Sequence, residues 1–376
     1  MSRLRIEALS TRIGAIPLKR PFITSRRRTE SVTVVTVELR LAGGATGIGT
    51  AAETFAVTGE SAASMAAALD GPIAAALTGA ERSLTGHAEA IAASCASNTS
   101  AKAAAEIALH DAWARGLGVP LATALGGDPA AELRTDMTVS LQDPATMAAD
   151  AVAAAEDGYR TLKIKLGGDW SADMDRLRAV NEAVPEASLR LDANQGWTVK
   201  DAIRAIRRIE DEGFPVELVE QPVHREDLHG LRQVTAAVMT PVMADEALTS
   251  PADALRLAGM RAADLFNIKL AKCGGIRQAL AIADIAHAAG IPCMVGAMME
   301  PRVSITAAAH LAAAHLAITL IDLDPAEWMA ENGPAGGYTM HGSRMVLPSA
   351  PGLGFQAGRS SSGRNAPERD TERTTP

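Results

Sequence analysis

The chain has 376 residues, which is more than one average domain requires, and 47% of them are hydrophobic, enough to build a large core. The net charge of −8 argues against nucleic acid or an anionic membrane surface as the main partner. The three cysteines (Cys95, Cys273 and Cys293) are far apart and form neither a disulfide framework nor a CxxC pair, so we expect reduced thiols.

The first residues, Met-Ser-Arg-Leu-Arg-Ile, lack the apolar segment of a signal peptide. The sequence also lacks an uncharged apolar run of about 20 residues, the length that crosses a bilayer. We therefore expect a cytoplasmic protein without a membrane partner.

The first part of the chain, residues 1–125, predicts an α+β domain. Residues 1–18 and 31–42 favour strands, and the polar, basic stretch 19–30 between them reads as a loop. Residues 60–95 and 99–116 are rich in alanine and favour helices. The segment Gly47-Ile-Gly-Thr-Ala-Ala52 resembles a dinucleotide fingerprint, but no helical pattern follows it, so we do not expect a nicotinamide site.

From residue 126 onward, strand-like and helical segments alternate, which indicates parallel βαβ units. Strands are predicted near residues 135–141, 160–166, 188–193, 216–221, 241–246, 264–270, 291–297 and 318–323. The pattern predicts an α/β fold with a (β/α) barrel over residues 126–324, a modified TIM barrel of seven to eight βα units, behind the α+β capping domain. Residues 325–355 are expected to complete the capping domain, and residues 356–376 to be disordered.

Two lysines stand at alternating positions of the second predicted barrel strand, Thr161-Leu-Lys-Ile-Lys-Leu166. Side chains alternate faces along a strand, so Lys163 and Lys165 point the same way. Two adjacent ammonium groups repel each other unless carboxylates or an anionic ligand balance their charge.

Carboxylates follow at the ends of the next three strands, Asp192, Glu220 and Asp245. The carboxyl ends of barrel strands form one face, so these acids are expected to converge there. Hard oxygen ligands without thiol or imidazole suit Mg²⁺. The sequence therefore predicts a magnesium site with Lys163 and Lys165 on one side and Lys269, at the end of the sixth strand, on the other.

This combination predicts proton abstraction next to a carboxylate. The metal would stabilise the enediolate that forms, and a nearby cation would lower the pKa of Lys165 so that it acts as a base. With lysines on opposite sides, one removes the proton and the other returns it, which inverts the carbon atom. A salt bridge to a ligand carboxylate is the alternative role for Lys269.

The same motifs resemble the enolase superfamily, in its muconate-lactonizing subgroup. The matching stretches are Thr161–Lys165, Leu191–Trp197, Glu217–Pro222, Met243–Glu246 and Asn267–Ile276, and the similarity extends over roughly residues 1–355. The resemblance implies Mg²⁺ at Asp192, Glu220 and Asp245, bases at Lys165 and Lys269, and assistance from Lys163. The mandelate racemase subgroup would have a histidine at the end of the seventh strand, where this chain reads Val295–Glu300.

Within the subgroup, Asp322-Leu-Asp324 resembles the Asp-x-Asp motif of dipeptide epimerases, which implies binding of a free α-ammonium group; a turn cap before Pro325 is the alternative role. Two carboxylates on one strand do favour a cation. The resemblance further implies that Thr138, Ala297, Met298 and Met299 line the substrate site, and that residues 19–30 and 53–60 form lid loops. An arginine of the first loop would contact a glutamate side chain, and Arg26, Arg27 and Arg28 are the candidates, with Arg27 as the choice.

The expected activity is therefore epimerisation of a dipeptide at its C-terminal residue, with L-Ala-D/L-Glu as the leading substrate. An N-acylamino acid racemase, or an enzyme resembling muconate cycloisomerase or o-succinylbenzoate synthase, is the alternative on the same scaffold. The expected partner is a small dipeptide, without nucleic acid, and a homo-oligomer is expected.

Overall fold

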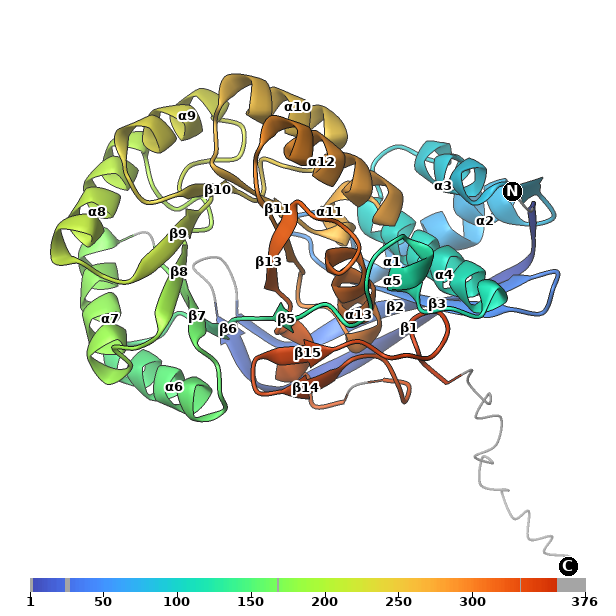
Figure 1. Cartoon of the computed structure of the whole chain (residues 1–376), viewed down its shortest axis with the longest axis horizontal. Helices are drawn as coiled ribbons and strands as arrows, with labels where there is room; N and C mark the ends of the chain where they lie inside the picture. Colours follow the sequence, from blue (N-terminus) through green and yellow to red (C-terminus); the bar gives the residue numbers. More distant parts are fainter. Residues whose placement is uncertain (1–2, 24–27, 168, 332, 357–376) are drawn as a thin grey trace, which may run out of the picture.

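The computed structural model describes residues 3–23, 28–167, 169–331 and 333–356, and the predicted disordered tail thus lies almost wholly outside the described residues. Figure 1 shows a barrel ringed by helices beside an N-terminal sheet. Within the described residues the N-terminal sheet has the order β3-β2-β1-β4. Its strands are β1 (Leu4–Ile23), β2 (Arg28–Leu41), β3 (Thr46–Ala52) and β4 (Glu81–Arg82).

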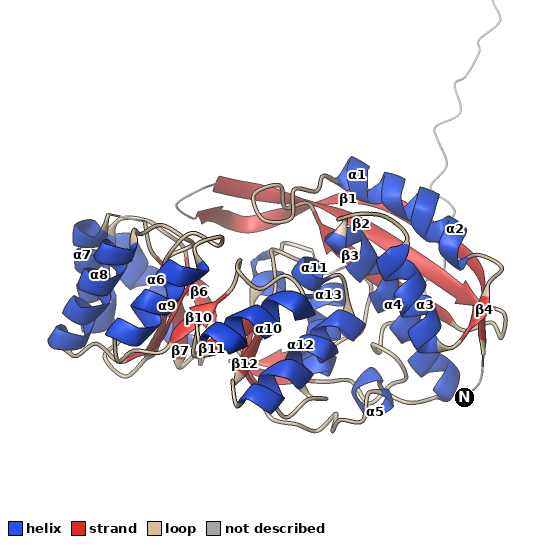
Figure 2. Ribbon diagram, turned by 90° about the horizontal axis from the view of Figure 1, so that it is seen from above, coloured by secondary structure: helices blue, strands red, loops and turns tan. Residues whose placement is uncertain are grey.

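The predicted basic loop at residues 19–30 is wrong, because most of it is strand. β1 continues to Ile23 and β2 begins at Arg28, with Phe22 paired to Thr29. Figure 2 shows this hairpin extending from the N-terminal sheet over the barrel. Its end is held by the barrel, since Arg20 lies over the Trp328 ring at 4.5 Å and Phe22 packs edge-on against the same ring.

Helices cover one face of the N-terminal sheet. The predicted helix over residues 60–95 is interrupted by a kink at Gly71 and by β4, whereas the second predicted helix is continuous as α4. The helical elements of this part of the chain are α1 (Ala62–Ala68), the π-helix η1 (Leu69–Ile73), α2 (Ala74–Leu77), α3 (Leu84–Ala93), α4 (Thr99–Leu117) and α5 (Leu121–Ala124).

The two glycines of the fingerprint-like segment allow β3 to pack directly on α4. A Cβ atom at Gly49 would lie 1.9 Å from the Ala104 carbonyl oxygen, and one at Gly47 would lie 2.0 Å from that of Ala108. These glycines lie in a strand against the alanine face of a buried helix, and not at the start of a helix as the fingerprint requires.

The second part of the chain is the predicted barrel. Its strands are β6 (Met137–Val139), β7 (Thr161–Lys165), β8 (Ser188–Asp192), β9 (Val216–Glu220), β10 (Val242–Ala244), β11 (Leu265–Ile268), β12 (Cys293–Gly296) and β13 (Ile318–Asp322). These eight described strands are parallel and pair in chain order, and a bridge between Thr135 and Ile321 joins the two ends. The predicted fold class is confirmed.

Helices surround the barrel, and their apolar faces pack on the strands in one large core. They are α6 (Pro144–Glu156), α7 (Trp170–Ala183), α8 (Val199–Glu212), α9 (Leu228–Ala237), α10 (Pro251–Met260), α11 (Leu270–Cys273), α12 (Ile276–Ala289) and α13 (Arg302–Ala312). Directly after β13 the described chain forms a short 3₁₀ turn, η2 (Pro325–Trp328), in place of a helix. Among the described helices, none is long and apolar enough to cross a membrane.

The segment after η2 contacts both parts of the molecule. β14 (Thr339–His341) and β15 (Arg344–Val346) form a small sheet with β5 (Leu133–Arg134), just before the barrel begins. Further along, the Leu353 amide donates to Asp111 of α4, and the Arg115 guanidinium donates to the Phe355 carbonyl. The end of the described chain is therefore fixed against the N-terminal helices.

Candidate active site

A cavity of about 100 Å³ lies at the carboxyl ends of the barrel strands. It is lined by side chains from both walls of the barrel and from the N-terminal part of the chain: Phe22, Ala56, Val57, Thr138, Lys163, Lys165, Asn194, Asp245, Glu246, Lys269, Ala297, Met298, Met299, Asp322, Asp324 and Pro325. Most of the residues predicted for the site line it, and Asp192 and Glu220 lie directly behind the lysines.

Strand alternation places the two lysines of β7 as predicted. Lys163 and Lys165 both face the cavity, while Leu162 and Ile164 are buried in the core outside the barrel. In the order of the eight described barrel strands, β11 lies four positions from β7. Lys269, which directly follows β11, therefore approaches the cavity from the wall opposite to Lys165.

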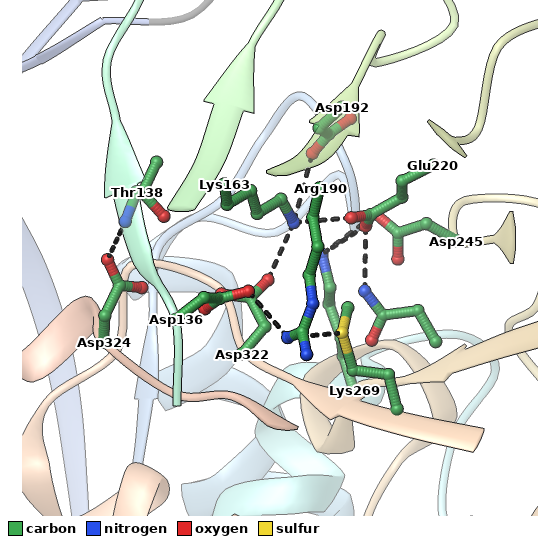
Figure 3. A network of polar contacts seen from close by, with 12 residues as sticks. Asp136, Thr138, Lys163, Arg190, Asp192, Glu220, Asp245, Lys269, Asp322 and Asp324 are labelled. Atoms are coloured by element: carbon green, nitrogen blue, oxygen red, sulfur yellow. Dashed lines mark hydrogen bonds and ion pairs between the residues drawn. The ribbon is translucent and has the colours of Figure 1, made fainter. Parts of the chain in front are cut away.

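The three predicted metal ligands are bound to these lysines. Lys165 Nζ lies 2.5 Å from Asp192 Oδ2, and Lys269 Nζ lies 2.9 Å from Asp245 Oδ2. Lys163 Nζ lies between two of the acids, 2.6 Å from Glu220 Oε2 and 3.2 Å from Asp192 Oδ2 (Figure 3). Lys163 thus bridges Asp192 and Glu220, and Lys269 bridges Glu220 and Asp245, so two lysines connect the three acids.

Three other acids lie closer together than the predicted metal ligands. Of the described residues, Asp136, Asp322 and Asp324 form a group whose carboxylate oxygens all lie within 4.8 Å of one another, and all three are buried. Asp192, Glu220 and Asp245 do not form such a group, because the lysine ammonium groups lie among their oxygens. Their predicted role as metal ligands stays a prediction.

The charges of the site are strongly coupled. Burial opposes ionisation, but Lys165 and Lys163 lower the pKa of Asp192 to about 2, and Lys269 and Lys272 hold the pKa of Asp245 far below its usual range. Glu220 differs, because burial and the negative charge of Asp192 raise its pKa to about 7.

The neighbouring carboxylates raise the pKa values of two lysines. Burial alone would lower the pKa of Lys163, but Asp322 and Glu220 outweigh it and raise that pKa well above its ordinary value. The pKa of Lys269 is raised in the same way, by Asp245 and Glu220. In this arrangement Lys163 and Lys269 are both protonated, because the carboxylates beside them stabilise the charged form.

The donor set fits a hard divalent cation. Glu220 Oε2 is buried and accepts no hydrogen bond of good geometry from the described residues, although Lys163 Nζ lies 2.6 Å away. The other Glu220 oxygen accepts from Asn267 Nδ2 at 2.8 Å, which fixes the carboxylate plane. A carboxylate held in this way, with one oxygen that accepts no well-formed hydrogen bond and two further acids beside it, suits Mg²⁺.

Asp322 and Asp324 lie in the same cavity as the lysines. Asp322 Oδ2 is 2.7 Å from Lys163 Nζ, whereas Asp324 Oδ2 accepts from the Thr138 amide (2.8 Å) and the Trp328 indole (3.0 Å). Thr138 therefore acts through its backbone on Asp324. Burial and the charge of Asp322 raise the pKa of Asp324 to about 6, so this pair is deficient in positive charge.

Both predicted lid segments reach the cavity, one through Phe22 of the hairpin and the other through Ala56 and Val57. Arg26 and the predicted substrate residue Arg27 lie outside the described residues. Arg28 is described and exposed, and its guanidinium pairs with Glu30 at 3.0 Å.

Several site residues were not predicted. Lys272 Nζ lies 2.5 Å from Asp245 Oδ1, and its position three residues after Lys269, within one helical turn, was a usable signal. Arg190 and Asp136 form a 2.9 Å ion pair inside the barrel. They stand two residues before Asp192 and Thr138, so strand alternation places them on the same inner face, one layer deeper.

Both parts of the chain match known protein families. Residues 8–126 match the model of the mandelate racemase / muconate lactonizing enzyme N-terminal domain, and residues 146–360 match the enolase C-terminal domain-like model.

Two L-Ala-D/L-Glu epimerases are 45% identical to this chain. The relative from Clostridium acetobutylicum aligns over 91% of this chain and 96% of its own length, and that from Bacillus subtilis over 94% and 97%. A solved substrate-liganded complex of the B. subtilis enzyme superposes with a TM-score of 0.90, covering 93% of this chain and 98% of its own. A dipeptide epimerase of Enterococcus faecalis V583, solved with Mg and L-Leu-L-Tyr, has 38% identity and a TM-score of 0.90, covering 94% of this chain and 100% of its own.

Proposed function

Because this chain belongs to the enolase superfamily, in its mandelate racemase and muconate lactonizing enzyme family, we propose that it is a Mg²⁺-dependent dipeptide epimerase that inverts the α-carbon of the C-terminal residue. The leading substrate is L-Ala-D/L-Glu, on which two relatives with 45% identity act according to their names.

One observation supports this proposal above the others. A single cavity is lined by lysines from opposite walls, Lys165 and Lys269, and by the acidic pair Asp322 and Asp324. A dipeptide has matching groups at each end, because its carboxylate belongs near the lysines and its α-ammonium group belongs near the acidic pair. The α-hydrogen of its C-terminal residue then lies between the two bases.

In the proposed mechanism, Asp192, Glu220 and Asp245 would hold Mg²⁺, which would supply electrostatic stabilisation of the charge that develops on the substrate carboxylate. Lys165 and Lys269, which pair with Asp192 and Asp245, are the proton-transfer groups. One lysine removes the α-proton from its side, and the other delivers a proton to the opposite face. Lys163 remains charged and stabilises the carboxylate end.

Asp322 and Asp324 distinguish this proposal from the alternative, an N-acylamino acid racemase. An N-acylated substrate has no ammonium group, and it would leave two buried carboxylates facing a neutral amide. Asp322→Asn and Asp324→Asn are expected to abolish activity on dipeptides, and an enzyme that does not use an ammonium group would be little affected.

The direct test is proton NMR in D₂O with Mg²⁺, on L-Ala-L-Glu beside L-Ala-L-Leu and L-Ala-L-Arg. We expect the α-proton signal of the C-terminal residue to disappear while resonances of the second diastereomer grow, and we expect EDTA to stop both changes. The dipeptide that reacts fastest gives the specificity. Absence of exchange in every dipeptide would contradict the proposal.

A further inference from the structure

The interior of the barrel below the proposed site is apolar on one side and charged on the other. On β9, β10, β12 and β13 the inner face below the site carries apolar side chains, which pack together with Leu265: Leu218, Met243, Met294 and Leu320. At the corresponding positions near β6 and on β8 stand Asp136 and Arg190, whose exposed fractions are 0% and 5%.

A buried ion pair in this position costs desolvation free energy, and apolar residues of similar volume often give a folded protein that is equally stable or more stable. The two carboxylate oxygens of Asp136 also differ in their hydrogen bonding. Asp136 Oδ2 accepts from Arg190 Nη1 at 2.9 Å, but Asp136 Oδ1 is fully buried and accepts no hydrogen bond from any described residue. Asp136 lies behind Asp322 and Asp324, with carboxylate oxygens of all three within 4.8 Å, and only those two reach the cavity.

The charges of this cluster do not cancel. Asp136, Asp322 and Asp324 carry three negative charges when all are ionised, and the described cations that pair with them are Arg190 and Lys163. Burial and the charge of Asp322 raise the pKa of Asp136 well above its usual range, because these two cations do not balance three carboxylates. Both cations are also shared with acids outside the cluster, Arg190 with Glu217 at 3.0 Å and Lys163 with Glu220 at 2.6 Å. The cluster is therefore at least one positive charge short, which matches a singly charged ammonium group.

We propose that Asp136 is a specificity-determining residue, whose charge behind Asp322 and Asp324 makes the site select substrates with a free α-ammonium group. This inference rests on the proposed function and extends it by one residue. Without Asp136, the cluster has one negative charge fewer beside the same two cations, Arg190 and Lys163, so its preference for a further cation is weakened. Asp136 acts through its neighbours and is not placed in contact with the substrate.

The test compares two ligands that differ at one group. N-propionyl-L-glutamate has a hydrogen atom where L-Ala-L-Glu has its α-ammonium group. Binding of both is measured by calorimetry with Mg²⁺, and the preference is the ratio of the two dissociation constants. A buried unit charge several ångström from an ammonium group changes its binding by roughly 10- to 100-fold at an effective dielectric constant of about 20, so Asp136→Asn is expected to lower the preference by about that factor.

Arg190→Gln provides the opposite change. It removes a positive charge from the cluster and is expected to raise the preference, and the double variant Asp136→Asn/Arg190→Gln is expected to return close to the wild-type value. A residue that only maintains the fold would give losses in all three variants. Because the two single variants change the preference in opposite directions, either one decides the question if the other does not fold.

Asp111→Asn is the matched control, because Asp111 is an equally buried acid that pairs with Arg115 at 2.9 Å, away from the cavity. It is expected to change thermal stability and leave the preference unchanged. The proposal is overturned if Asp136→Asn keeps the wild-type preference or weakens both ligands equally. The proposed function fails separately, if the wild-type protein binds dipeptides but exchanges no α-proton.

Discussion

Loss of one lysine is expected to abolish epimerisation while one half of the chemistry survives. Lys165 and Lys269 come from opposite walls of the barrel, so neither reaches the face of the substrate that the other serves. In Lys165→Ala or Lys269→Ala, one face of the α-carbon then lacks a general base. Such a base contributes about 10²- to 10⁴-fold, which corresponds to roughly 3–5 kcal/mol of transition-state stabilisation.

The carboxylates around these lysines indicate that the variants will fold. After Lys269→Ala, Asp245 keeps Lys272 at 2.5 Å, and after Lys165→Ala, Asp192 keeps Lys163 at 3.2 Å and the Asn194 amide at 2.9 Å. Neither change leaves a buried charge without a partner, so the loss of activity reports on the chemistry.

The assay is proton NMR in D₂O with each diastereomer supplied separately. Each variant is expected to exchange the α-proton of one diastereomer only, and the two variants are expected to act on opposite ones. Lys102→Ala is a suitable control, because Lys102 is also buried but donates to the Cys95 carbonyl outside the site. A two-base mechanism is refuted if either variant epimerises at the wild-type rate, or if both variants exchange the same diastereomer.

Three further predictions concern the metal, the fold and pH. Mg²⁺ at about 100 times its dissociation constant should stabilise the protein by about 2.7 kcal/mol in thermal melts, and Glu220→Gln should remove most of this gain. Gly49→Ala should destabilise the protein by about 1–3 kcal/mol in urea unfolding, because its Cβ would lie 1.9 Å from the Ala104 carbonyl, whereas Gly14→Ala has nothing within 4 Å and should be nearly neutral. Glu106, whose pKa burial raises to about 8 from 4.5, binds a proton in the folded protein that the unfolded chain has lost, so its contribution lowers stability as the pH rises between these values. Glu106→Gln should therefore become more stable relative to wild type from pH 5 to pH 8, by roughly 3–4 kcal/mol in pH-dependent melts.

Each of these has a contrary outcome. An equal Mg²⁺ shift in wild type and Glu220→Gln would remove Glu220 from the metal site. Equal stability of Gly49→Ala and Gly14→Ala would mean that β3 can move away from α4. A constant difference between Glu106→Gln and wild type across the pH range would mean that Glu106 is ionised when folded.

The barrel and the positions of its charged residues were predictable because they depend on local period and on closure. The alternation of Lys163 and Lys165 is visible within five residues, and closure of the sheet brings distant strand ends to one face. The deeper pair, Asp136 and Arg190, follows the same alternation and was equally predictable. Arg190 stands two positions before Asp192, and the same alternation applies to it.

Other features depend on partners far away in the sequence. Residues 19–30 look like a loop because they are polar, but Arg20 stacks on Trp328 and pairs with Asp150. The start of α4 is similar, since its first amides at Ser100 and Ala101 donate to the Glu60 carboxylate and not to a neighbouring side chain. Secondary-structure propensity cannot predict these contacts, because it depends on neighbouring residues and each contact joins segments that are 40 or more residues apart.

Lys163 touches both halves of the site, with Glu220 at 2.6 Å and Asp322 at 2.7 Å. One ammonium group therefore belongs to two subsites, and a ligand in either subsite changes the charge that the lysine offers to the other. Thermodynamic linkage makes this coupling reciprocal, so the factor by which a dipeptide alters Mg²⁺ affinity equals the factor by which Mg²⁺ alters dipeptide affinity. In the proposed site, the affinity for Mg²⁺ would therefore depend on which dipeptide is bound beside it.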